Sequence, residues 1–453
     1  MKCVVGIDLG STTTKAVLLD EQGGILGRGI TNSRSNYEVA SAVAWTEAVT
    51  SARFDLLERA MPSTSGSWAK PMKDAFRLEL FIDELAELRA TILRNLERSL
   101  TVHGDRKALA TTVGEVLDRV RRKAEPLFVG GAPRRSEFFR DIAGALYVAE
   151  AEEISRAGGA PFEQLAALYD RAILEVETRA QRRDVGGLLR RALDRVLPAD
   201  RAENATARAA AAQAIATAAA QTIEEIAVVG TGYGRQTLPF ARESVRSEIL
   251  CHGRGAHRVF PGTRTVLDIG GQDTKAIQVD DHGVVTSFQM NDRCAAGCGR
   301  YLGYIADELN LGLHELGPLA LQATKSVKVC STCTVFAGAE LRERLALGQK
   351  REDILAGLHR AIMLRAMSLL ARSGGVQNEF TFTGGVCNNG MAVKVLRELV
   401  NENYDPTTTL NIHPDSIYMG ALGAALFGLD DARAGRLAPM PPFLRAVASE
   451  VSA

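Results

Sequence analysis

The chain has 453 residues, of which 54 are Lys or Arg and 54 are Asp or Glu, so its formal charge is zero. That balance gives no electrostatic basis for binding nucleic acid or a membrane surface. With 46% hydrophobic and 24% charged residues, the composition excludes disorder, collagen and a small disulfide scaffold, and it predicts a globular protein of roughly two to three domains.

The pattern of apolar runs and polar turns over residues 1–38 predicts a β-hairpin followed by a third short strand. One apolar run ends at Asp8, the turn Gly10-Ser-Thr-Thr-Thr-Lys15 follows, and a second apolar run ends at Asp20. The first run begins directly after Met1, which leaves no room for a secretory leader. The alanine-rich stretch 209–220 is not apolar enough to span a bilayer. We therefore expect a cytoplasmic protein.

Residues 39–220 predict a mainly helical subdomain inserted after that third strand. Apolar residues recur with a period of about 3.6, for example over 76–100 and 165–197, and Arg and Glu fill many polar positions. Such alternating charges are typical of solvated helix faces, so no site residue is assigned here. Leu127-Phe-Val-Gly-Gly has the pattern of a strand and a turn, to which we give a structural role.

Residues 221–453 contain a second copy of the first turn. The sequence Asp268-Ile-Gly-Gly-Gln-Asp-Thr-Lys275 and the run after it match residues 8–23 at a constant offset of 260. Matching residues in register make chance a poor explanation, and we infer a duplication of the hairpin. The identical pairs are Asp8/Asp268, Gly10/Gly270, Thr14/Thr274, Lys15/Lys275, Ala16/Ala276, Asp20/Asp280 and Gly23/Gly283.

The repeated turn has the residue types of a phosphate site. Glycines let backbone N–H groups approach an anion, hydroxyls add donors, Lys adds charge, and Asp can hold the water shell of a metal ion. Two such loops facing each other predict a triphosphate site. The sequence contains no Gly-x4-Gly-Lys-[Ser/Thr] loop, and Gly230-Thr-Gly-Tyr-Gly differs from the dinucleotide fingerprint.

Four of the seven cysteines lie within 40 residues, in Cys294-Ala-Ala-Gly-Cys298 and Cys330-Ser-Thr-Cys333. Each group precedes an amphipathic helical pattern, and a helix N-terminus stabilises thiolates. The spacing predicts a metal site in a reduced compartment but does not decide between zinc and an iron–sulfur cluster. The other three cysteines, Cys3, Cys251 and Cys387, are expected to be packing residues.

A third motif, Glu379-Phe-Thr-Phe-Thr-Gly384-Gly385, predicts a strand that ends in paired glycines before a helix near Met391. Such a turn suits close approach of a nucleobase or ribose. The order of hairpin, hairpin, glycine turn and a small-residue helix from Tyr418 resembles the actin, sugar-kinase and Hsp70 superfamily. The resemblance implies an α/β chain with a duplicated actin/sugar-kinase/Hsp70-like ATPase fold and a large helical insertion.

The cysteine motifs, together with Gly230-Thr-Gly-Tyr-Gly-Arg and Ser247-Glu-Ile, narrow the resemblance further. They are similar to the ATP-dependent electron activators, which include the 2-hydroxyacyl-CoA dehydratase activators and the ATPase subunits of benzoyl-CoA reductase. The resemblance covers residues 1–38 and 221–453. It implies ATP, Mg²⁺ and a [4Fe-4S] cluster shared by two chains, each of which gives two cysteines as ligands.

The resemblance assigns roles to individual residues. Asp8 and Asp268 would be catalytic, positioning the metal and the attacking water. Cys294 and Cys333 would ligate the cluster, and Cys298 and Cys330 are possible additional ligands that depart from the family pattern. Glu248 and Glu340 are possible supporting groups near nucleotide and cluster. The nucleotide-binding residues would be Gly10, Ser11, Thr12, Thr13, Thr14, Lys15, Gly270, Gly271, Gln272, Asp273, Lys275, Gly384, Gly385 and Asn388.

The insertion at 39–220 resembles the larger ATPase subunit of benzoyl-CoA reductase, an enzyme of anaerobic aromatic degradation. The implied partners are a smaller homologous ATPase subunit that shares the cluster, the substrate-binding reductase subunits and a low-potential electron donor such as ferredoxin. Three alternatives stay open: a 2-hydroxyacyl-CoA dehydratase activator, a small-molecule kinase with Asp268 as base, and a non-redox ATPase. The seven scattered histidines are assigned ordinary surface or core roles.

Overall fold

The structure is a computed structural model of the full chain. It describes residues 1–33, 36–60, 69–98, 106–130, 138–178, 184–199, 204–232, 238–291, 298–325, 327–329, 334–436 and 440–445. Two compact units are present, Met1–Val49 with Ile223–Ala446, and Thr50–Thr222. Their junction at Val49 lies inside helix α1 (Tyr37–Ala60), and the domain boundaries expected at residues 38 and 220 stay a prediction.

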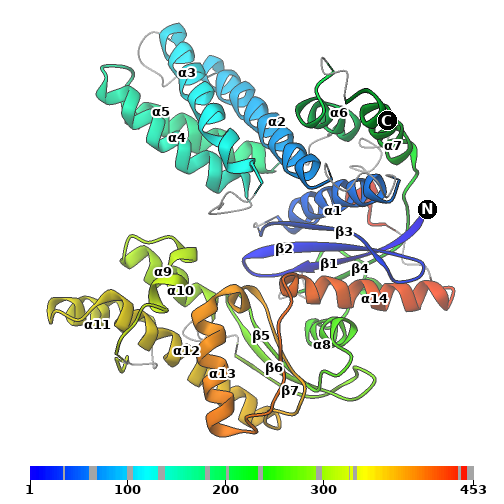
Figure 1. Cartoon of the computed structure of the whole chain (residues 1–453), viewed down its shortest axis with the longest axis vertical. Coiled ribbons are helices and arrows are strands. Elements are labelled where there is room, and N and C mark those ends of the chain that lie inside the picture. The colour runs from blue at the N-terminus through cyan, green and yellow to red at the C-terminus, as the bar shows by residue number, and fades with distance from the viewer. Residues whose placement is uncertain are drawn as a thin grey trace. The chain divides into compact units, whose positions relative to one another are not determined.

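The first unit begins with a four-stranded sheet. Its order is β3-β2-β1-β4, with the first three strands antiparallel and β4 parallel to β1 (Figure 1). Val4, Val5 and Ile7 of β1 are fully buried, so both faces of this sheet are covered. The strands are β1 (Lys2–Leu9), β2 (Thr13–Asp20), β3 (Ile25–Asn32) and β4 (Glu224–Gly232).

The second sheet repeats this topology. Its order is β7-β6-β5-β8-β9, with an antiparallel β5-β6-β7 meander and β8 parallel to β5. Asp8 lies opposite Lys15 in the first hairpin, and Asp268 lies opposite Lys275 in the second. The predicted duplicated α/β fold is confirmed. The strands are β5 (Thr265–Ile269), β6 (Thr274–Val279), β7 (Val285–Asn291), β8 (Phe380–Thr383) and β9 (Leu410–Asn411).

Helices on the second sheet form the largest core of this unit. Helix α12 (Arg351–Ser373) is its central member, and among the described residues it is the one helix long and apolar enough to cross a membrane. Its apolar window is 72% buried within the protein, which is typical of a core helix. The others are α9 (Gly299–Glu308), α10 (Leu313–Ala320), α11 (Thr334–Ala346) and α13 (Gly390–Asn403).

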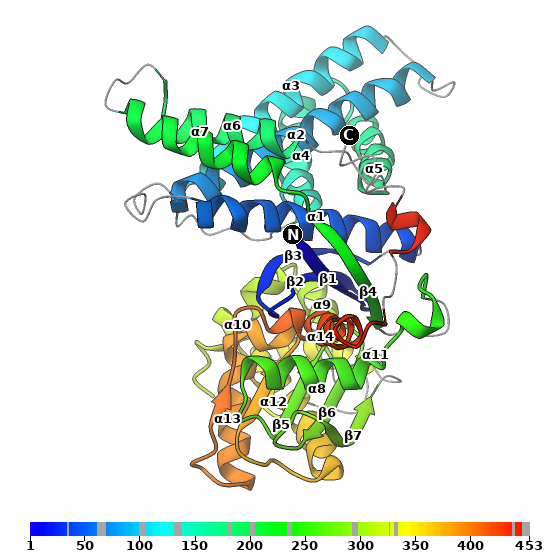
Figure 2. The same cartoon turned by 90° about the vertical axis from the view of Figure 1, so that its right-hand side faces the viewer.

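Helices α8 (Glu248–Val259) and α14 (Met419–Arg433) lie side by side between the two sheets (Figures 1 and 2). Helix α14 packs on β1, β2 and β4, and α8 packs on β5, β6 and β7. Small residues allow this close approach, because a Cβ at Gly423 would overlap the backbone of Cys251 and one at Gly6 would overlap the backbone of Ala425. This packing places α8 at the centre of the unit.

The second unit is helical. Helices α2 (Ala69–Arg98), α3 (Arg106–Ala124), α4 (Phe139–Arg156) and α5 (Phe162–Thr178) share one apolar core. Helices α6 (Val185–Val196) and α7 (Ala205–Ala220) pack with the ends of α1 and α2 in another. The buried carboxylate of Glu79 on α2 pairs with Arg191 and Arg195 on α6.

One local expectation in this unit is wrong. The strand expected at Leu127 is a short 3₁₀ helix, Glu125–Phe128. Pro126 lies in its first turn, where a fixed φ near −65° favours a helical turn over a strand. The apolar period over 165–197 covers two helices, and Asp184 begins the second by accepting a hydrogen bond from the backbone N–H of Gly187 at 2.8 Å.

Candidate functional site

Two aspartate–lysine pairs form the centre of the site. Directly opposite residues in a β-hairpin point to the same face of the sheet, so Lys15 reaches Asp8 and Lys275 reaches Asp268. The distances from Nζ to Oδ2 are 3.7 Å and 3.3 Å. Both aspartates are 2% exposed. The structure therefore places the two predicted catalytic aspartates at equivalent positions of the two sheets.

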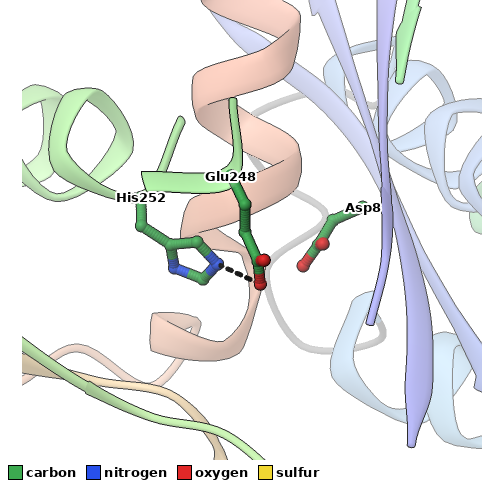
Figure 3. Close-up of side chains that lie close together, drawn as sticks. All are labelled: Asp8, Glu248 and His252. Atoms are coloured by element: carbon green, nitrogen blue, oxygen red, sulfur yellow. Dashed lines mark ion pairs between the residues drawn. The ribbon is translucent and has the colours of Figure 1, made fainter. Parts of the chain in front are cut away.

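Helix α8 lies between these aspartates. Glu248 and His252 are one turn apart on the same face of α8, with Nε2 of His252 4.0 Å from Oε1 of Glu248 (Figure 3). Nδ1 of His252 lies 3.3 Å from Oδ1 of Asp268. Figure 3 shows the carboxyl group of Asp8 directed toward that of Glu248. The helix thus connects the acidic groups of both sheets.

Lys275 is the centre of a buried ion network. Its Nζ lies 2.8 Å from Oδ1 of Asp273 and 3.0 Å from Oε1 of Glu248, in addition to its contact with Asp268. Burial alone would lower the pKa of Lys275, but these three carboxylates raise it well above its ordinary value. Lys275 is therefore protonated at neutral pH. Removing one member of a buried ion network leaves another charge unpaired and destabilises the fold.

Asp268 and Glu248 respond differently to this environment. Burial favours the neutral form of Asp268, but the charges of His252 and Lys275 outweigh it and lower the pKa of this carboxyl group well below its usual range. The hydroxyl of Thr383 also donates to Oδ1 of Asp268, at 2.8 Å. For Glu248 burial outweighs the charge of Lys275, and its pKa is raised. Neighbouring carboxyl groups with diverging pKa values are typical of functional sites.

The two predicted phosphate loops lie next to each other. A Cβ at Gly271 would overlap the side chain of Thr12 and lie 2.9 Å from the Cβ of that residue. Ser33 fixes the first loop, because its Oγ donates to the carbonyl oxygen of Gly10 at 2.5 Å and lies 3.0 Å from Oγ1 of Thr14. The loops therefore bring glycines and hydroxyl groups of both halves to one place.

The predicted adenosine turn follows strand β8. Gly384 has a φ of +84°, and a Cβ there would lie 2.9 Å from the backbone nitrogen of Ile269, so only glycine suits this position. A Cβ at Gly385 would meet nothing within 4 Å. Asn388 is exposed, whereas Asn389 caps α13 by accepting hydrogen bonds from two backbone N–H groups at 3.0 and 3.1 Å. The turn is therefore open beside Gly385 and anchored at Asn389.

The predicted cluster ligands Cys294, Cys330 and Cys333 lie outside the described residues, so their role stays a prediction. Cys298 is fully buried and is the N-cap residue of α9. Glu340 pairs with Arg344 one turn further along α11 at 2.6 Å, and its place near a cluster is likewise a prediction. The other cysteines are buried, and burial raises the pKa of each thiol. They are Cys3, Cys251 and Cys387.

The second phosphate loop is joined directly to the start of α9. The backbone N–H of Gly299 donates to the carbonyl oxygen of Gly270 at 2.9 Å, and that of Arg300 donates to Gly271 at 2.7 Å. Two successive backbone hydrogen bonds hold the first turn of α9 against the loop. The first turn of α9 is therefore anchored at the predicted nucleotide site.

Several residues of this site were not predicted. The sequence predicts an ordinary role for His252, but this residue lies between Asp268 and Glu248. Burial lowers the pKa of His252, but the charge of Asp268 outweighs burial and raises the pKa above its ordinary value. The spacing Glu248-x3-His252 was the available signal, because it places both side chains on one helix face. Thr383 and Ser33 gave no signal, since hydroxyl residues in strands and turns are common.

A divalent cation suits this donor set. Asp8, Glu248 and His252 each offer one ligand atom, and these atoms all lie within 4.8 Å of one another. Two carboxylates and one imidazole are ligands of several divalent metals. Oδ1 of Asp8 is buried without a hydrogen-bond partner in the part of the chain that the structure describes. The two carboxylates therefore fit the Mg²⁺ that the resemblance implies, and the imidazole adds a nitrogen donor of the kind that transition-metal ions favour.

The two sheets share one strand arrangement, and the first hairpin of each carries an aspartate opposite a lysine. These features define a duplicated ATPase fold of the actin, sugar-kinase and Hsp70 kind. Component A of (R)-2-hydroxyglutaryl-CoA dehydratase from Acidaminococcus fermentans has this fold in its crystal structure. The TM-score is 0.53 at 22% identity, over 96% of this chain and 100% of that one.

The profile of the BadF/BadG/BcrA/BcrD ATPase family matches residues 5–428, and the chain belongs to that family. The 2-hydroxyisocaproyl-CoA dehydratase activator of Clostridioides difficile is 41% identical over 207 residues, which are 46% of this chain and 74% of that protein. A benzoyl-CoA reductase subunit of Thauera aromatica is 34% identical over 209 residues, 46% of this chain and 72% of that one. The predicted family is confirmed.

Proposed function

We propose that this chain is the ATP-hydrolysing, electron-activating subunit of a benzoyl-CoA reductase, which couples ATP hydrolysis to low-potential electron transfer. Membership of an ATPase family supports the nucleotide part of this proposal. The similarity to a dehydratase activator and to a benzoyl-CoA reductase subunit supports the redox part. A cytoplasmic location is part of the same proposal.

The two loops and the glycine turn would hold the nucleotide. Residues 10–15 and 270–275 would contact the phosphates, and Gly384, Gly385 and Asn388 the adenosine. Asp8 and Asp268 would position the metal and the attacking water, and Lys15 would balance the charge of the phosphates. A bound Mg²⁺ would neutralise charge on the phosphate oxygens, and phosphoryl transfer to water needs little beyond placement and neutralisation.

The main support for coupling ATP hydrolysis to the cluster is the pair of hydrogen bonds between the second phosphate loop and α9. Because Gly270 and Gly271 accept from the first turn of α9, a change in the loop on nucleotide binding or hydrolysis moves the start of that helix. Cys298 is the residue at this start, and Cys294 precedes it by four positions. Nucleotide state would therefore alter the surroundings of a cluster bound by this segment.

The cluster would be a [4Fe-4S] centre shared by two chains. Cys294 and Cys333 are the proposed ligands, and Cys298 and Cys330 are possible additional ones. The backbone N–H groups that begin a helix favour the negative charge of thiolates and of a reduced cluster. The buried position of Cys298 at the N-cap of α9 supports a setting of this kind.

The proposed partners follow from the choice of reductase. They are a smaller homologous ATPase subunit that shares the cluster, the subunits that bind the aromatic thioester, and a low-potential donor such as ferredoxin. The helices from α2 to α7 support this choice, because they form an insertion in the ATPase core and the larger ATPase subunit of the reductase carries such an insertion. No residue of that unit is given a catalytic role.

A second candidate is a 2-hydroxyacyl-CoA dehydratase activator. The specific observation in its favour is the 41% identity to the Clostridioides difficile activator, compared with 34% to the benzoyl-CoA reductase subunit. An activator is a homodimer that reduces its partner once for many turnovers. A reductase subunit spends ATP for every electron that reaches substrate.

The test is iron, acid-labile sulfide and ATP turnover of anaerobically purified protein, expressed alone and with its smaller partner. About four irons per dimer would support a shared [4Fe-4S] cluster. ATP use that scales with each electron delivered supports the reductase, and ATP use needed only for initial activation supports the dehydratase activator. Protein without iron, or with stoichiometric zinc, would overturn both and favour a kinase-like ATPase.

A further inference from the structure

Three buried side chains converge on one point beside the proposed phosphate site. Asp8 lies near the end of β1, and Glu248 and His252 lie on one face of α8. Their exposed fractions are 2%, 5% and 6%. Their ligand atoms lie within 4.8 Å of one another, and opposite ligands of one small divalent cation are about 4 Å apart.

The carboxylate of Asp8 points to a ligand other than a protein group. Its Oδ1 is buried and has no hydrogen-bond partner among the described residues. Its nearest ion-pair partner, Lys15, contacts the other oxygen at 3.7 Å. A buried acceptor without a partner destabilises the folded chain, and a cation coordinated by Oδ1 would remove that cost.

Gly420 on α14 keeps the space between these groups open. A Cβ at this position would lie 2.8 Å from Oδ2 of Asp8 and 2.8 Å from Nε2 of His252. Any side chain at residue 420 would therefore occupy the position where atoms of Asp8 and His252 face each other. The glycine leaves room there for an ion.

His252 has a carboxylate on the side of the ring away from the proposed cation. Its Nδ1 lies 3.3 Å from Oδ1 of Asp268 but has no hydrogen-bond partner among the described residues. Its Nε2 faces Glu248 and the Cβ position of Gly420. A carboxylate behind a histidine fixes the tautomer and strengthens the other nitrogen as a ligand. A small rotation of the imidazole would let Nδ1–H donate to Asp268, which would then support the cation through His252.

The surrounding charges favour a cation. Four carboxylates and three basic groups surround the site, so its net charge is −1 even when the imidazole is protonated. A buried net negative charge attracts a cation. The groups are the carboxylates of Asp8, Glu248, Asp268 and Asp273, opposed by Lys15, Lys275 and His252.

We propose that Asp8, Glu248 and His252 form a divalent-cation site that fills without nucleotide, with Nε2 of His252 as a direct ligand. The inference rests on the proposed function and deepens it, because a cation held here meets the phosphates as ATP enters between the loops. Helix α8 then supplies two metal ligands from outside the repeated hairpins.

The experiment uses Mn²⁺ alone, added to the full-length, anaerobically purified protein without nucleotide. Loss of the free Mn²⁺ EPR signal gives the number of bound ions and their affinity, and we expect one ion per chain. Electron spin echo modulation of the bound ion is expected to show coupling to one ¹⁴N nucleus, from His252. This second readout needs no variant, so a misfolded mutant does not affect it.

Three variants locate the site. Glu248→Gln and His252→Gln remove ligands and are expected to weaken Mn²⁺ binding by at least about tenfold, and Gly420→Ala fills the space and is expected to do the same. Matched controls are Glu243→Gln, which alters an exposed carboxylate just before α8, and His257→Gln, further along α8. Both controls are expected to bind Mn²⁺ as the wild type does.

Wild-type protein that binds no Mn²⁺ until nucleotide is added would overturn the proposal. Bound Mn²⁺ without nitrogen coupling, or with unchanged affinity in Glu248→Gln and His252→Gln, would overturn it equally. Binding of a fluorescent ATP analogue in EDTA tests the proposed function separately. Failure to bind the analogue, with Mn²⁺ still bound at His252, would remove the nucleotide site and leave the cation site in place.

Discussion

Gly271 and Thr12 bring the two copies of the repeated hairpin into contact, because the backbone of Gly271 passes against the Thr12 side chain with room for no Cβ. The same Gly271 accepts a hydrogen bond from the backbone of Arg300 in the first turn of α9. One residue therefore contacts the opposite phosphate loop and also holds the helix that follows the cysteine segment. A change in the distance between the two loops would therefore move Gly271 and, with it, the first turn of α9.

Gly271→Ala is expected to force the two loops apart, since the new Cβ would lie 2.9 Å from the Cβ of Thr12 and closer still to its methyl and hydroxyl groups. We expect ATP hydrolysis to fall by about tenfold or more, because small misplacements of phosphate-binding groups are costly to phosphoryl transfer. Steady-state ATPase activity of the full-length protein measures the loss.

A double-mutant cycle identifies the contact as the cause. Thr12→Gly removes the side chain that the new Cβ would meet, so Gly271→Ala should cost little more in the Thr12→Gly background. Equal losses in both backgrounds would show that residue 271 acts through its own backbone conformation, and would contradict the contact between the loops as the explanation.

Asp8→Asn and Asp268→Asn are expected to abolish ATP-driven electron transfer alike but to affect stability differently. Asp268 has two buried cationic neighbours and a hydrogen bond from Thr383, so its loss should destabilise its sheet by about 3–5 kcal/mol. Asp8 has one ion pair at 3.7 Å and an oxygen without a partner among the described residues, so Asp8→Asn should be close to neutral.

Hydrogen exchange of peptides that cover β1 and β5 measures these effects locally, which suits a chain with two units. Faster exchange in β5 of Asp268→Asn, with unchanged exchange in β1 of Asp8→Asn, is the expected result. Iron content should stay at the wild-type value in both variants. Loss of iron in Asp8→Asn would mean that this aspartate has a folding role instead.

The repeated hairpin was predictable because its chemistry is local. Identical residues at a constant offset, Asp8 with Asp268 and Lys15 with Lys275, mark equivalent positions of the two hairpins. Short continuous apolar runs bounded by turn residues indicate the strands. The glycine turn at Gly384 was predictable for a similar reason, since a strand that ends in paired glycines marks a backbone that others approach closely.

The contribution of α8 was not predictable to the same degree. His252 lies 16 residues before Asp268 in the sequence, and only the packing of α8 between both sheets brings its imidazole to that carboxylate. Gly420 functions through the space it leaves beside Asp8, which no local pattern shows. Contacts between segments that share no repeat or spacing are fixed by tertiary packing alone.

The low pKa of Asp268 gives stability a specific pH dependence. Its folded pKa lies below the ordinary value, which is about 3.9 in the unfolded chain, so its stabilising contribution is present above about pH 4 and is lost as the pH falls further. Asp268→Asn has no such contribution. The difference in exchange rates of β5 and β6 between wild type and Asp268→Asn should therefore be equally large at pH 7 and 5, and it should be smaller, though not absent, at pH 3. A difference that does not decrease at all between pH 5 and pH 3 would contradict this assignment.

Asn388 and Asn389 are adjacent but are expected to have separable effects. Asn388 is exposed at the adenosine turn, so Asn388→Ala should weaken ATP binding and leave stability unchanged. Asn389 caps α13, and its amide donates to Nε2 of His359 at 2.9 Å, while the Nδ1 of that ring lies 2.7 Å from the Leu355 carbonyl oxygen. Burial lowers the pKa of His359, which keeps Nε2 free to accept.

Asn389→Ala removes both the cap and the hydrogen bond to the imidazole, and it should destabilise α13 by about 1–3 kcal/mol. Hydrogen exchange at the start of α13 and calorimetric titration with ATP, carried out on both variants, separate the two effects. Because a loosened α13 also disturbs the turn at Gly384, Asn389→Ala should bind ATP more weakly, with a larger loss as the temperature rises. Asn388→Ala should show a loss that changes little with temperature. Equal stability of the two variants would contradict the capping role of Asn389 and leave the anchoring of the adenosine turn to Gly384 alone.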